Sequence, residues 1–526
     1  MQQRITINFN TDSKTTDKTT ILEYCSSHGI AGIETPCGGK GTCGKCKVTV
    51  TKPYYKDVLA CRTKICDGME IIVGGKESTG TKEDSMVVLT NGENVSEKFN
   101  EHVNRNVEDT LAACDIGTTT VVCYLIDKET GQIISTRSGA NPQRSFGADV
   151  LSRIDAAARA DDNDKANGGL QMMQTQIVSL LNGWISEMLT ECGRTKVSRF
   201  SVAGNTVMCH LLMGISPVKM GKAPFLPDEY FGRAFNPLDI GLENCQTMII
   251  FPAVSGFVGG DITAGMMETV NCNELTLYLD IGTNGEMALG KGDRYVCCAT
   301  AAGPAFEGAQ IEMGMPASKG AVDKVWLEGR RIKYSVIGND RPVGLCGSGL
   351  IDALALLLKA GIIDENGTIL SGQELPILFR SYVFEVEAED AAQSTETSLA
   401  VHIAPGVYIT QEDIRKLQLA KGAIAAGIDI LFKEYGCKPC DLDILTFAGG
   451  FGNYIDKASA AAIGLFPQEL LDRAKEVGNA AGNGAVSAAL SQEAWERALE
   501  ISKDMRYIEL ASYPHFDEMY VEHMNF

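Results

Sequence analysis

The stretch LAACDIGTTTVVCYLID at residues 111–127 has a near copy, LTLYLDIGTNGEMALG, at residues 275–290. Each copy is an apolar run, a turn of Gly with hydroxyl or amide side chains, and a second apolar run, the pattern typical of two strands joined by a hairpin turn. The equivalent acidic residues, Asp115 and Asp280, lie 165 positions apart. This is the length of one α/β subdomain, so the repeat predicts an α/β body with two similar halves.

The two turns also predict a phosphate site, because successive backbone N–H groups in a tight turn form a concave surface that binds anions. We expect the phosphates to be held from opposite sides by Gly117, Thr118 and Thr119 of the first turn and by Gly282, Thr283 and Asn284 of the second. Asp115 and Asp280 are the candidate catalytic carboxylates. They could hold Mg²⁺ through water or orient the water that attacks a phosphate.

A third motif, DILTFAGGFGNYID at residues 443–456, follows an amphipathic helix expected over residues 411–435. It is a buried strand that runs into a Gly-Gly turn. Because glycine has no side chain, an adenine ring can pack directly against the backbone of Gly449 and Gly450. The chain has no Walker loop and no dinucleotide fingerprint after a strand, so these alternative nucleotide signatures are excluded.

A cysteine motif dominates the first 75 residues. The pattern C-x5-C-x2-C-x14-C comprises Cys37, Cys43, Cys46 and Cys61. Four thiolates are the ligands of an iron–sulfur cluster, whereas a zinc site would more often pair two short Cys knuckles. Cys66 is an alternative fourth ligand, and Cys25 is expected to be a structural thiol.

The segments around these cysteines predict a small β-grasp domain. They are alternating runs at residues 5–9, 47–51 and 69–73 with a helix near residues 20–28. The predicted organisation is therefore a cluster domain at 1–75, a polar linker at 76–110, a first α/β subdomain with a phosphate turn at 111–270 and a second at 271–526.

Composition narrows the class of function. The net charge of −20 disfavours binding to nucleic acid or to an anionic membrane surface. The N-terminal sequence MQQRITINFN lacks the apolar core of a signal peptide, and no run of about 18 apolar residues is long enough to span a bilayer. We therefore expect a cytoplasmic protein, in which the 17 cysteines serve metal ligation or remain reduced.

Several other residues are candidates with weaker support. Cys297, Cys298 and His210 are expected in the core, the pair Cys437 and Cys440 is expected to be structural, and Cys346 is expected near the nucleotide cleft. Three carboxylates beside the Gly-rich stretches could assist at the site, Asp261 as a Mg²⁺ neighbour and Glu286 and Glu307 in positioning water.

The two hairpins followed by the Gly-Gly loop resemble the superfamily of acetate and sugar kinases, Hsp70 and actin, which closes around ATP between two duplicated domains. Together with the [2Fe–2S] ferredoxin-type cysteine pattern and the stretches FPAVSGFVGGDITAG (251–265) and TAAGPAFEGAQIEMGMPA (300–317), the chain resembles the reductive activators of corrinoid enzymes. The resemblance covers nearly the whole chain.

The resemblance implies ATP-dependent reduction of an inactive Co(II) corrinoid protein to Co(I) by an electron from the cluster. It further implies ATP and Mg²⁺ as ligands, a corrinoid methyltransferase protein as partner, a low-potential electron donor and a homodimer. Two rival functions remain open, a ferredoxin-fused small-molecule kinase of the same superfamily and an ATP-gated chaperone for corrinoid proteins. Relatives often carry an extra small domain where this chain has only residues 76–110, and no Cys follows Cys440 to ligate a C-terminal [4Fe–4S] cluster.

Overall fold

The computed structural model describes residues 3–7, 19–27, 33, 46–52, 55–66, 68–73, 110–159, 168–387, 397–449 and 454–526. The predicted ligands Cys37 and Cys43, the predicted adenine contact Gly450 and the predicted linker up to residue 109 lie outside these ranges. Within the described ranges, no helix combines the length and the apolar character that crossing a membrane requires.

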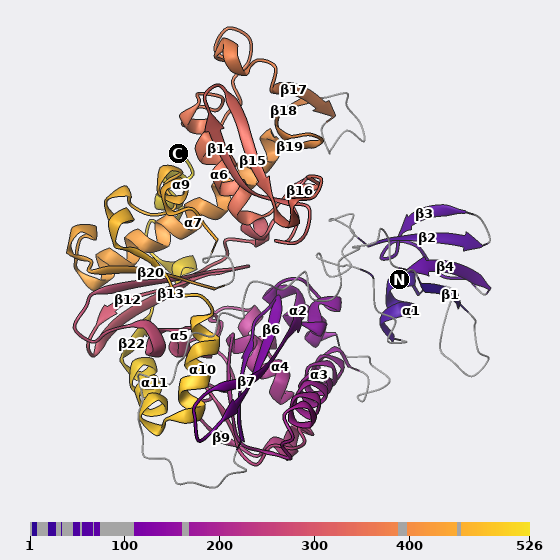
Figure 1. Ribbon diagram of the computed structural model, residues 1–526, viewed down its shortest axis with the longest axis vertical. Helices are drawn as coiled ribbons and strands as arrows, with labels where there is room; N and C mark the ends of the chain where they lie inside the picture. Colours follow the sequence, from indigo (N-terminus) through magenta and orange to yellow (C-terminus); the bar gives the residue numbers. More distant parts are fainter. Residues whose placement is uncertain are drawn as a thin grey trace.

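The described part of the N-terminal unit comprises a four-stranded sheet and one helix, drawn in indigo in Figure 1. Its elements are β1 (Gln3–Ile7), α1 (Ile21–Ser27), β2 (Lys47–Lys52), β3 (Lys56–Leu59) and β4 (Met69–Val73). The strand order is β1-β4-β2-β3, and each neighbouring pair is antiparallel. Apolar side chains of α1, including Ile21 and Cys25, pack against Val50 and Ile71 of the sheet. The predicted β-grasp unit is confirmed, with β3 as a strand that the sequence pattern does not predict.

The first half of the body is a six-stranded sheet with the order β7-β6-β5-β8-β10-β9. Its strands are β5 (Thr110–Ile116), β6 (Thr120–Asp127), β7 (Ile133–Ala140), β8 (Val197–Gly204), β9 (Arg233–Phe235) and β10 (Met248–Ile250). The helices between them are α2 (Val150–Ala158), α3 (Gly169–Glu191) and α4 (Thr206–Met213), and α5 (Gly260–Thr269) follows β10. Because side chains alternate along a strand, Ala112 and Cys114 of β5 pack with α3, whereas Leu111 and Ala113 face the opposite layer.

The second half repeats this topology. Its sheet has the order β21-β20-β11-β12-β13-β22, built from β11 (Thr276–Ile281), β12 (Gly285–Lys291), β13 (Arg294–Thr300), β20 (Ile444–Ala448), β21 (Ala474–Glu476) and β22 (Met505–Tyr507). In each half three antiparallel strands are followed by two parallel ones, with a helix after each parallel strand. In the second half α9 (Lys457–Ala462) follows β20 and α10 (Ala480–Leu490) follows β21, whereas α7 (Gln411–Tyr435) precedes β20 and α11 (Gln492–Asp504) follows α10. The predicted duplicated actin-like fold is therefore confirmed.

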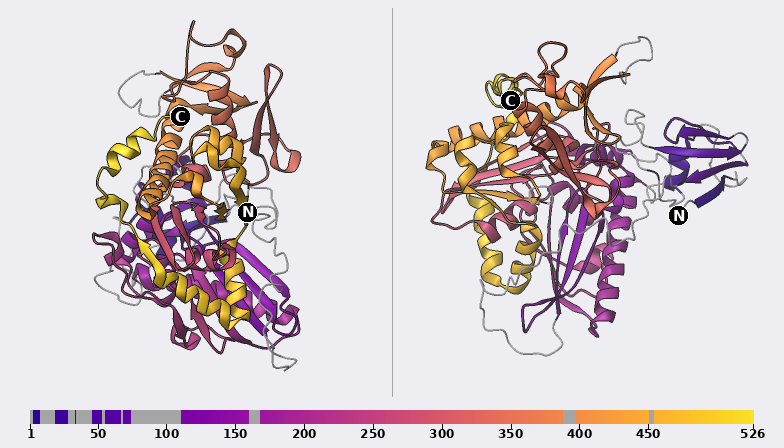
Figure 2. Two further views of the ribbon diagram at one scale, coloured as in Figure 1. Left: turned by 90° about the vertical axis from the view of Figure 1, so that its left-hand side faces the viewer. Right: turned by 45° about the horizontal axis from the view of Figure 1, so that its top comes forward.

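The helices α5, α10 and α11 form a layer between the two sheets, as Figures 1 and 2 show. A single core cluster joins Leu111 and Ala203 of the first sheet, Tyr278 and Ala448 of the second, and Ala485 of α10. The two halves, which are separate stretches of the sequence, thus share one apolar core.

An insertion between β13 and α7 forms the upper part of the molecule in Figure 1. It contains α6 (Gly347–Lys359) and two three-stranded sheets, made of β14 (Ala321–Glu328), β15 (Arg331–Val336) and β16 (Gly344–Leu345), and of β17 (Val383–Glu387), β18 (Thr397–Ala404) and β19 (Val407–Thr410). The long helix α7 begins at a reciprocal capping box formed by Thr410 and Asp413 and ends at Gly436 in the left-handed conformation, so the helix predicted over 411–435 is confirmed. The C-terminal helix α12 (Phe516–Glu522) packs on α7.

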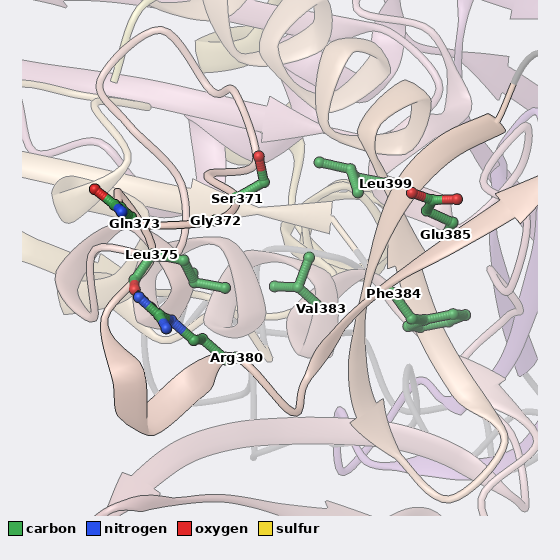
Figure 3. A pocket seen from close by; sticks show the side chains of 9 residues that line it. All are labelled: Ser371, Gly372, Gln373, Leu375, Arg380, Val383, Phe384, Glu385 and Leu399. Atoms are coloured by element: carbon green, nitrogen blue, oxygen red, sulfur yellow. Dashed lines mark hydrogen bonds between the residues drawn. The ribbon is translucent and has the colours of Figure 1, made fainter.

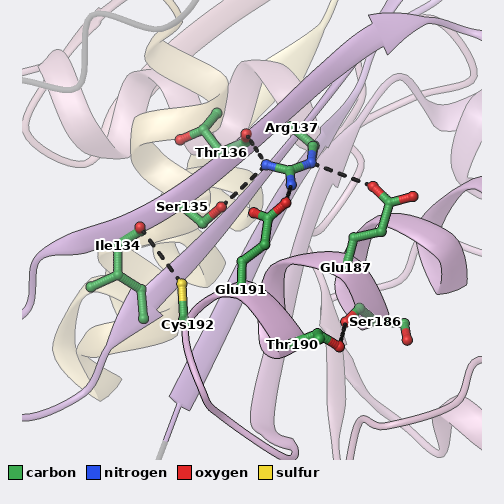
Figure 4. A network of polar contacts seen from close by, with 9 residues as sticks. All are labelled: Ile134, Ser135, Thr136, Arg137, Ser186, Glu187, Thr190, Glu191 and Cys192. Carbon is green, nitrogen blue, oxygen red and sulfur yellow. Dashed lines mark hydrogen bonds and ion pairs between the residues drawn. The ribbon is translucent and has the colours of Figure 1, made fainter.

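The edge strand β7 is tied to α3 by one arginine. Figure 4 shows Arg137 with its guanidinium between Glu187 and Glu191, with which it forms ion pairs. The same group donates hydrogen bonds to Ser135 Oγ (3.3 Å) and to the carbonyl oxygen of Thr136 (3.1 Å). Charged side chains on an edge strand disfavour its pairing with another chain.

The contact between α5 and α10 depends on glycine. A Cβ at Gly484 of α10 would lie 2.2 Å from the carbonyl oxygen of Ala264 in α5, closer than atoms can approach. We expect Gly484→Ala to lower the free energy of unfolding by about 1–3 kcal/mol, because the helices must separate. Urea unfolding followed by circular dichroism measures the change.

The matched control is Gly183→Ala in the exposed side of α3, where no atom lies within 4 Å of the new Cβ. Since alanine is the better helix former, this variant should gain about 0.5–1 kcal/mol. Equal effects of the two substitutions would contradict the role of the helix crossing.

Candidate functional site

The two predicted phosphate turns face one carboxylate. Glu307, the last residue of the short helix η6 (Pro304–Glu307), accepts a hydrogen bond from Thr119 Oγ1 of the first turn (3.4 Å) and from Thr283 Oγ1 of the second (3.0 Å). The structure therefore brings the two turns together, although Thr119 and Thr283 are 164 positions apart in the sequence. Glu307 itself is partly exposed.

In each turn, one backbone N–H group forms a hydrogen bond within the hairpin itself. The N–H of Gly117 donates to the carbonyl oxygen of Thr120 (2.9 Å), and the N–H of Gly282 donates to that of Asn284 (2.9 Å). These two groups close the hairpins and are not free for a ligand. The candidate phosphate-binding N–H groups are therefore those of Thr118, Thr119, Thr283 and Asn284.

Four carboxylates crowd the same space. Burial and the neighbouring charges of Asp261 and Asp280 raise the pKa of Asp115 to about 8. Burial and Asp261 raise the pKa of Asp280 to about 7, and the pKa of Glu286 is also raised by burial and by the same two aspartates. Burial raises the pKa of Asp261 to about 6, limited by hydrogen bonds from backbone N–H groups at the start of α5. The weaker candidates Asp261 and Glu286 thus share one electrostatic environment with Asp115 and Asp280.

The acidic cluster of Asp115, Asp261, Asp280 and Glu286 fits a divalent cation held through water. Among the described residues, no three His, Cys, Asp or Glu side chains converge closely enough to ligate a metal directly. Mg²⁺ loses its water ligands reluctantly and is usually bound by one or two carboxylates, water and substrate phosphates. When bound, such an ion would supply positive charge beside the phosphates and offset the repulsion between the carboxylates.

Gly449 lies directly against the acidic cluster. It follows β20, has φ +80°, and a Cβ on it would lie 2.3 Å from Asp280 Oδ1. Both the left-handed backbone and the short distance require glycine at this position. The start of the Gly-Gly loop therefore lies beside one of the two candidate catalytic carboxylates.

Sequence reasoning missed the residues that support the first turn. Asn479, the N-cap of α10, forms a hydrogen bond with the side chain of Asp115 and donates from Nδ2 to Tyr124 OH (3.3 Å). Asn141 and Arg153, discussed below, bond to the carbonyl groups of the first turn. The sequence signal for Asn479 is that of a helix start, and nothing in it reveals that the helix begins next to Asp115.

The described cysteines of the N-terminal unit agree with a cluster site. Cys46 Sγ lies 3.1 Å from Cys61 Sγ. Two thiolates on one tetrahedral metal ion, each at about 2.3 Å, would lie roughly 3.7 Å apart, so a small shift fits this pair to iron. Cys66 is exposed, whereas Cys25 is buried and burial raises the pKa of its thiol to about 11, as expected of a structural cysteine.

Of the remaining sequence candidates, some lie in the core as predicted and the others stay predictions. His210 is buried, with Nδ1 2.8 Å from the carbonyl oxygen of Thr206 and Nε2 accepting the N–H of Glu229 (3.3 Å), which confirms a core histidine. Cys297 and Cys298 are buried thiols, as predicted. Cys346 is the buried N-cap residue of α6, and its predicted place near the nucleotide stays a prediction, as does the structural role of Cys437 and the exposed Cys440.

The insertion has a hollow of about 540 Å³, which lies outside the two turns and the acidic cluster. Figure 3 shows the hydrophobic side chains of Leu375, Val383 and Leu399 and the polar ends of Arg380 and Glu385 around it. It contains none of the predicted site residues.

Comparison with known proteins agrees with this geometry. The chain matches a 2Fe-2S iron-sulfur cluster binding domain at residues 7–66, the RACo middle region at 111–271 and the C-terminal domain of RACo, the ASKHA domain, at 274–526. The corrinoid activation enzyme RamQ of Eubacterium limosum is 33% identical over 577 residues, covering 95% of this chain and 95% of RamQ.

Two further relatives extend the comparison. The [Co(II) methylated amine-specific corrinoid protein] reductase of Methanosarcina barkeri is 26% identical over 453 residues, covering 78% of this chain and 75% of the reductase. A solved structure of a reductive activator for corrinoid,iron-sulfur protein superposes with a TM-score of 0.67 at 29% identity, covering 99% of this chain and 98% of that one.

Fold and site together define an ASKHA-type ATPase fused to a 2Fe-2S domain. The chain belongs to the RACo family of corrinoid activators.

The raised pKa of Asp280 makes stability depend on pH. Its folded pKa of about 7 exceeds its ordinary value of 3.8, so between these values the folded protein holds a proton that the unfolded chain releases. The free energy of unfolding should therefore fall as pH rises through this interval. At pH 8 we expect Asp280→Asn to raise the apparent unfolding temperature of the ligand-free protein by about 2 °C or more and to weaken Mg-ATP binding at least tenfold.

Thermal unfolding at pH 5 and pH 8, with titration calorimetry for Mg-ATP, measures both effects. Asp293→Asn serves as control, because Asp293 is exposed in the turn at the other end of β12. If the unfolding temperature of Asp280→Asn changed with pH as much as that of the wild type, the pKa of Asp280 would not be raised in the folded protein.

Proposed function

We propose that this protein uses ATP to reactivate a corrinoid protein, reducing inactive Co(II) to Co(I) by one electron from a [2Fe–2S] cluster. The observation that carries the proposal is the presence in one chain of both parts, the paired thiols of Cys46 and Cys61 and the two phosphate turns that meet at Glu307. The relatives named as a corrinoid activation enzyme and a Co(II) corrinoid protein reductase support it.

The cysteine centre would be the entry point for the electron. We propose Cys37, Cys43, Cys46 and Cys61 as the cluster ligands, and a low-potential donor as the source of the electron. When bound, the cluster supplies a one-electron donor with a potential near about −400 mV. Cys46 lies directly before β2 and Cys61 just after β3, so the antiparallel pairing of these strands holds their thiols together.

Reduction of Co(II) in a protein is typically harder than reduction of such a cluster, so the transfer needs a source of free energy. For one electron, each 60 mV of unfavourable difference costs roughly 1.4 kcal/mol. Hydrolysis of ATP at the two turns could offset this cost by favouring a complex with the corrinoid protein in which the cobalt loses an axial ligand.

In the ATPase body we propose that the remaining turn N–H groups and the threonine hydroxyls bind the phosphates. Gly449 and Gly450 would contact the adenosine, and Asp115 and Asp280 would hold Mg²⁺ through water or orient the attacking water. Glu307 lies between the two turns, where it could accept the proton of that water. A homodimer completes the proposal, and a particle mass of twice the 56.5 kDa chain in solution would test it.

The direct test mixes the reduced protein anaerobically with a Co(II) corrinoid protein and follows the Co(I) absorption band. We expect Co(I) with the wild type only when ATP is present. Cys61→Ser should lose the visible absorption of the cluster and form no Co(I), because serine oxygen is a poor replacement for a soft thiolate ligand.

The matched control is Cys66→Ser, which changes an exposed thiol in the same unit and should keep both the cluster and the activity. Full activity of Cys61→Ser would favour the chaperone. Equal rates of Co(I) formation with and without ATP would leave only an electron carrier. An intact cluster with no Co(I) from any corrinoid partner would favour the kinase.

Glu307 gives a separate test of the hydrolysis step. Glu307→Gln retains an oxygen that accepts hydrogen bonds from the threonines but cannot take up a proton. We therefore expect phosphate release from ATP to slow by about 100-fold, while calorimetry shows Mg-ATP affinity within about threefold of the wild type.

Glu312→Gln is the control for this substitution, since Glu312 lies in the same loop but is exposed and bonded to Tyr408. Unchanged hydrolysis by Glu307→Gln would assign Glu307 to joining the turns alone.

A further inference from the structure

Three carbonyl groups of the first phosphate turn are bonded from one side. Asn141 Nδ2 donates to the carbonyl oxygen of Gly117 (2.8 Å), and the backbone N–H of Asn141 donates to that of Thr119 (2.9 Å). Between them, Arg153 Nη2 donates to the carbonyl oxygen of Thr118. Both residues come from the segment 141–153, which follows β7 and enters α2.

These hydrogen bonds determine the direction in which the backbone N–H groups of the turn point. In a planar trans peptide the C=O and the following N–H point in opposite directions. Since the carbonyls of Gly117 and Thr118 point to segment 141–153, the N–H groups of Thr118 and Thr119 point away from it. Neither N–H has an acceptor within the described part of the chain. The side chain of Thr119, on the same turn, reaches Glu307 and so marks the side where the two turns meet.

Arg153 is held by several contacts, and its charge is not neutralised by an ion pair within the described part of the chain. Its side chain is fully buried, Nε donates to the carbonyl oxygen of Gly147 (3.0 Å), and Nη1 contacts Met208 Sδ of α4. No ion pair of Arg153 occurs among the described residues. Asp149 lies nearby, but one of its oxygens caps α2 by accepting the N–H of Ser152 (2.7 Å). Burying a cation without a carboxylate is costly, which favours an anion as its counter-charge.

The second turn has a different setting. Asn284 Nδ2 donates to Glu286 Oε1 (3.3 Å), so a carboxylate of the acidic cluster lies beside this turn. Asp115 of the same cluster lies just before the first turn, so the feature that distinguishes the two turns is the buried positive charge behind the first. That charge would attract phosphate oxygens toward the first turn.

We infer that Arg153 and Asn141 are positioning residues of the nucleotide site, which turn the N–H groups of Thr118 and Thr119 toward the ATP phosphates and place a buried positive charge behind them. This inference rests on the proposed binding of ATP. Segment 141–153 would therefore contribute to phosphate recognition, together with the Gly and Thr residues of the turn.

The test compares ligands that differ only in phosphate. Titration calorimetry with ATP, ADP and adenosine, each with Mg²⁺, is carried out on the full-length protein. We expect Arg153→Met to weaken ATP binding about tenfold or more and adenosine binding less than twofold. Arg153→Lys, which keeps the charge but cannot donate from a fork to both Thr118 and Gly147, should recover part of the loss.

A second variant avoids the risk that removal of a buried arginine unfolds the protein. Asn141→Asp keeps the oxygen that caps the next turn by accepting the N–H of Gln143 (2.9 Å) and replaces the donor to Gly117 by an acceptor. It should weaken ATP binding more than adenosine binding, as Arg153→Met does.

The matched control is Arg473→Met. Arg473 also donates to several backbone carbonyls, those of Pro439, Cys440 and Leu442, but outside the nucleotide site. It should change thermal stability and leave ATP binding as in the wild type. Equal losses of ATP and adenosine affinity in the Arg153 and Asn141 variants, or ATP binding unchanged by them, would overturn the inference. Failure of the wild type itself to bind ATP would instead overturn the proposed function.

Discussion

The close crossing of α5 and α10 is the constraint on which the remaining architecture depends. Each helix follows the last parallel strand of its half, so the two are equivalent elements of the duplication. Small residues let their backbones approach, with Gly265 next to Tyr278 and Ala480, and Gly484 next to Ala264. Because both sheets bury their inner faces against this helix layer, the hairpin turns at the corresponding strand ends are brought to the same space.

That space is electrostatically unfavourable when it contains only protein. Four carboxylates share it. Burial raises the pKa of each, and repulsion by neighbouring aspartates raises the pKa of Asp115, Asp280 and Glu286 further. A protein keeps such crowding when a ligand relieves it, because a bound cation converts the repulsion into attraction. The buried Arg153 behind the first turn has the complementary property, a positive charge that an anion would neutralise. The carboxylates and the buried arginine are therefore complementary in charge to the cation and the phosphates of the proposed ligand.

Glu307 connects this site with the rest of the chain. It ends the short helix η6, which packs against both α6 and α7 and lies at the beginning of the insertion. A phosphate group entering between the turns would compete with the carboxylate for the hydroxyls of Thr119 and Thr283. The nucleotide state could thus be transmitted to η6 and the insertion through one side chain, by exchange of hydrogen bonds over a short distance.

Local patterns in the sequence were sufficient for the elements that carry the site and for the class of protein, but not for β3 or for the two sheets of the insertion. The repeated hairpins, the capped helix at 411–435 and the cysteine spacing depend on residues that are close in the chain, so periodicity, capping and ligand chemistry identify them. Only the tertiary structure decided which distant residues act together. Asp261 and Glu286 join Asp115 and Asp280, Glu307 bonds to both turns, and Arg153 supports Thr118 from the next helix. These relations follow from the way two sheets pack on shared helices, and packing of segments far apart in the chain leaves no periodic signal in the sequence itself.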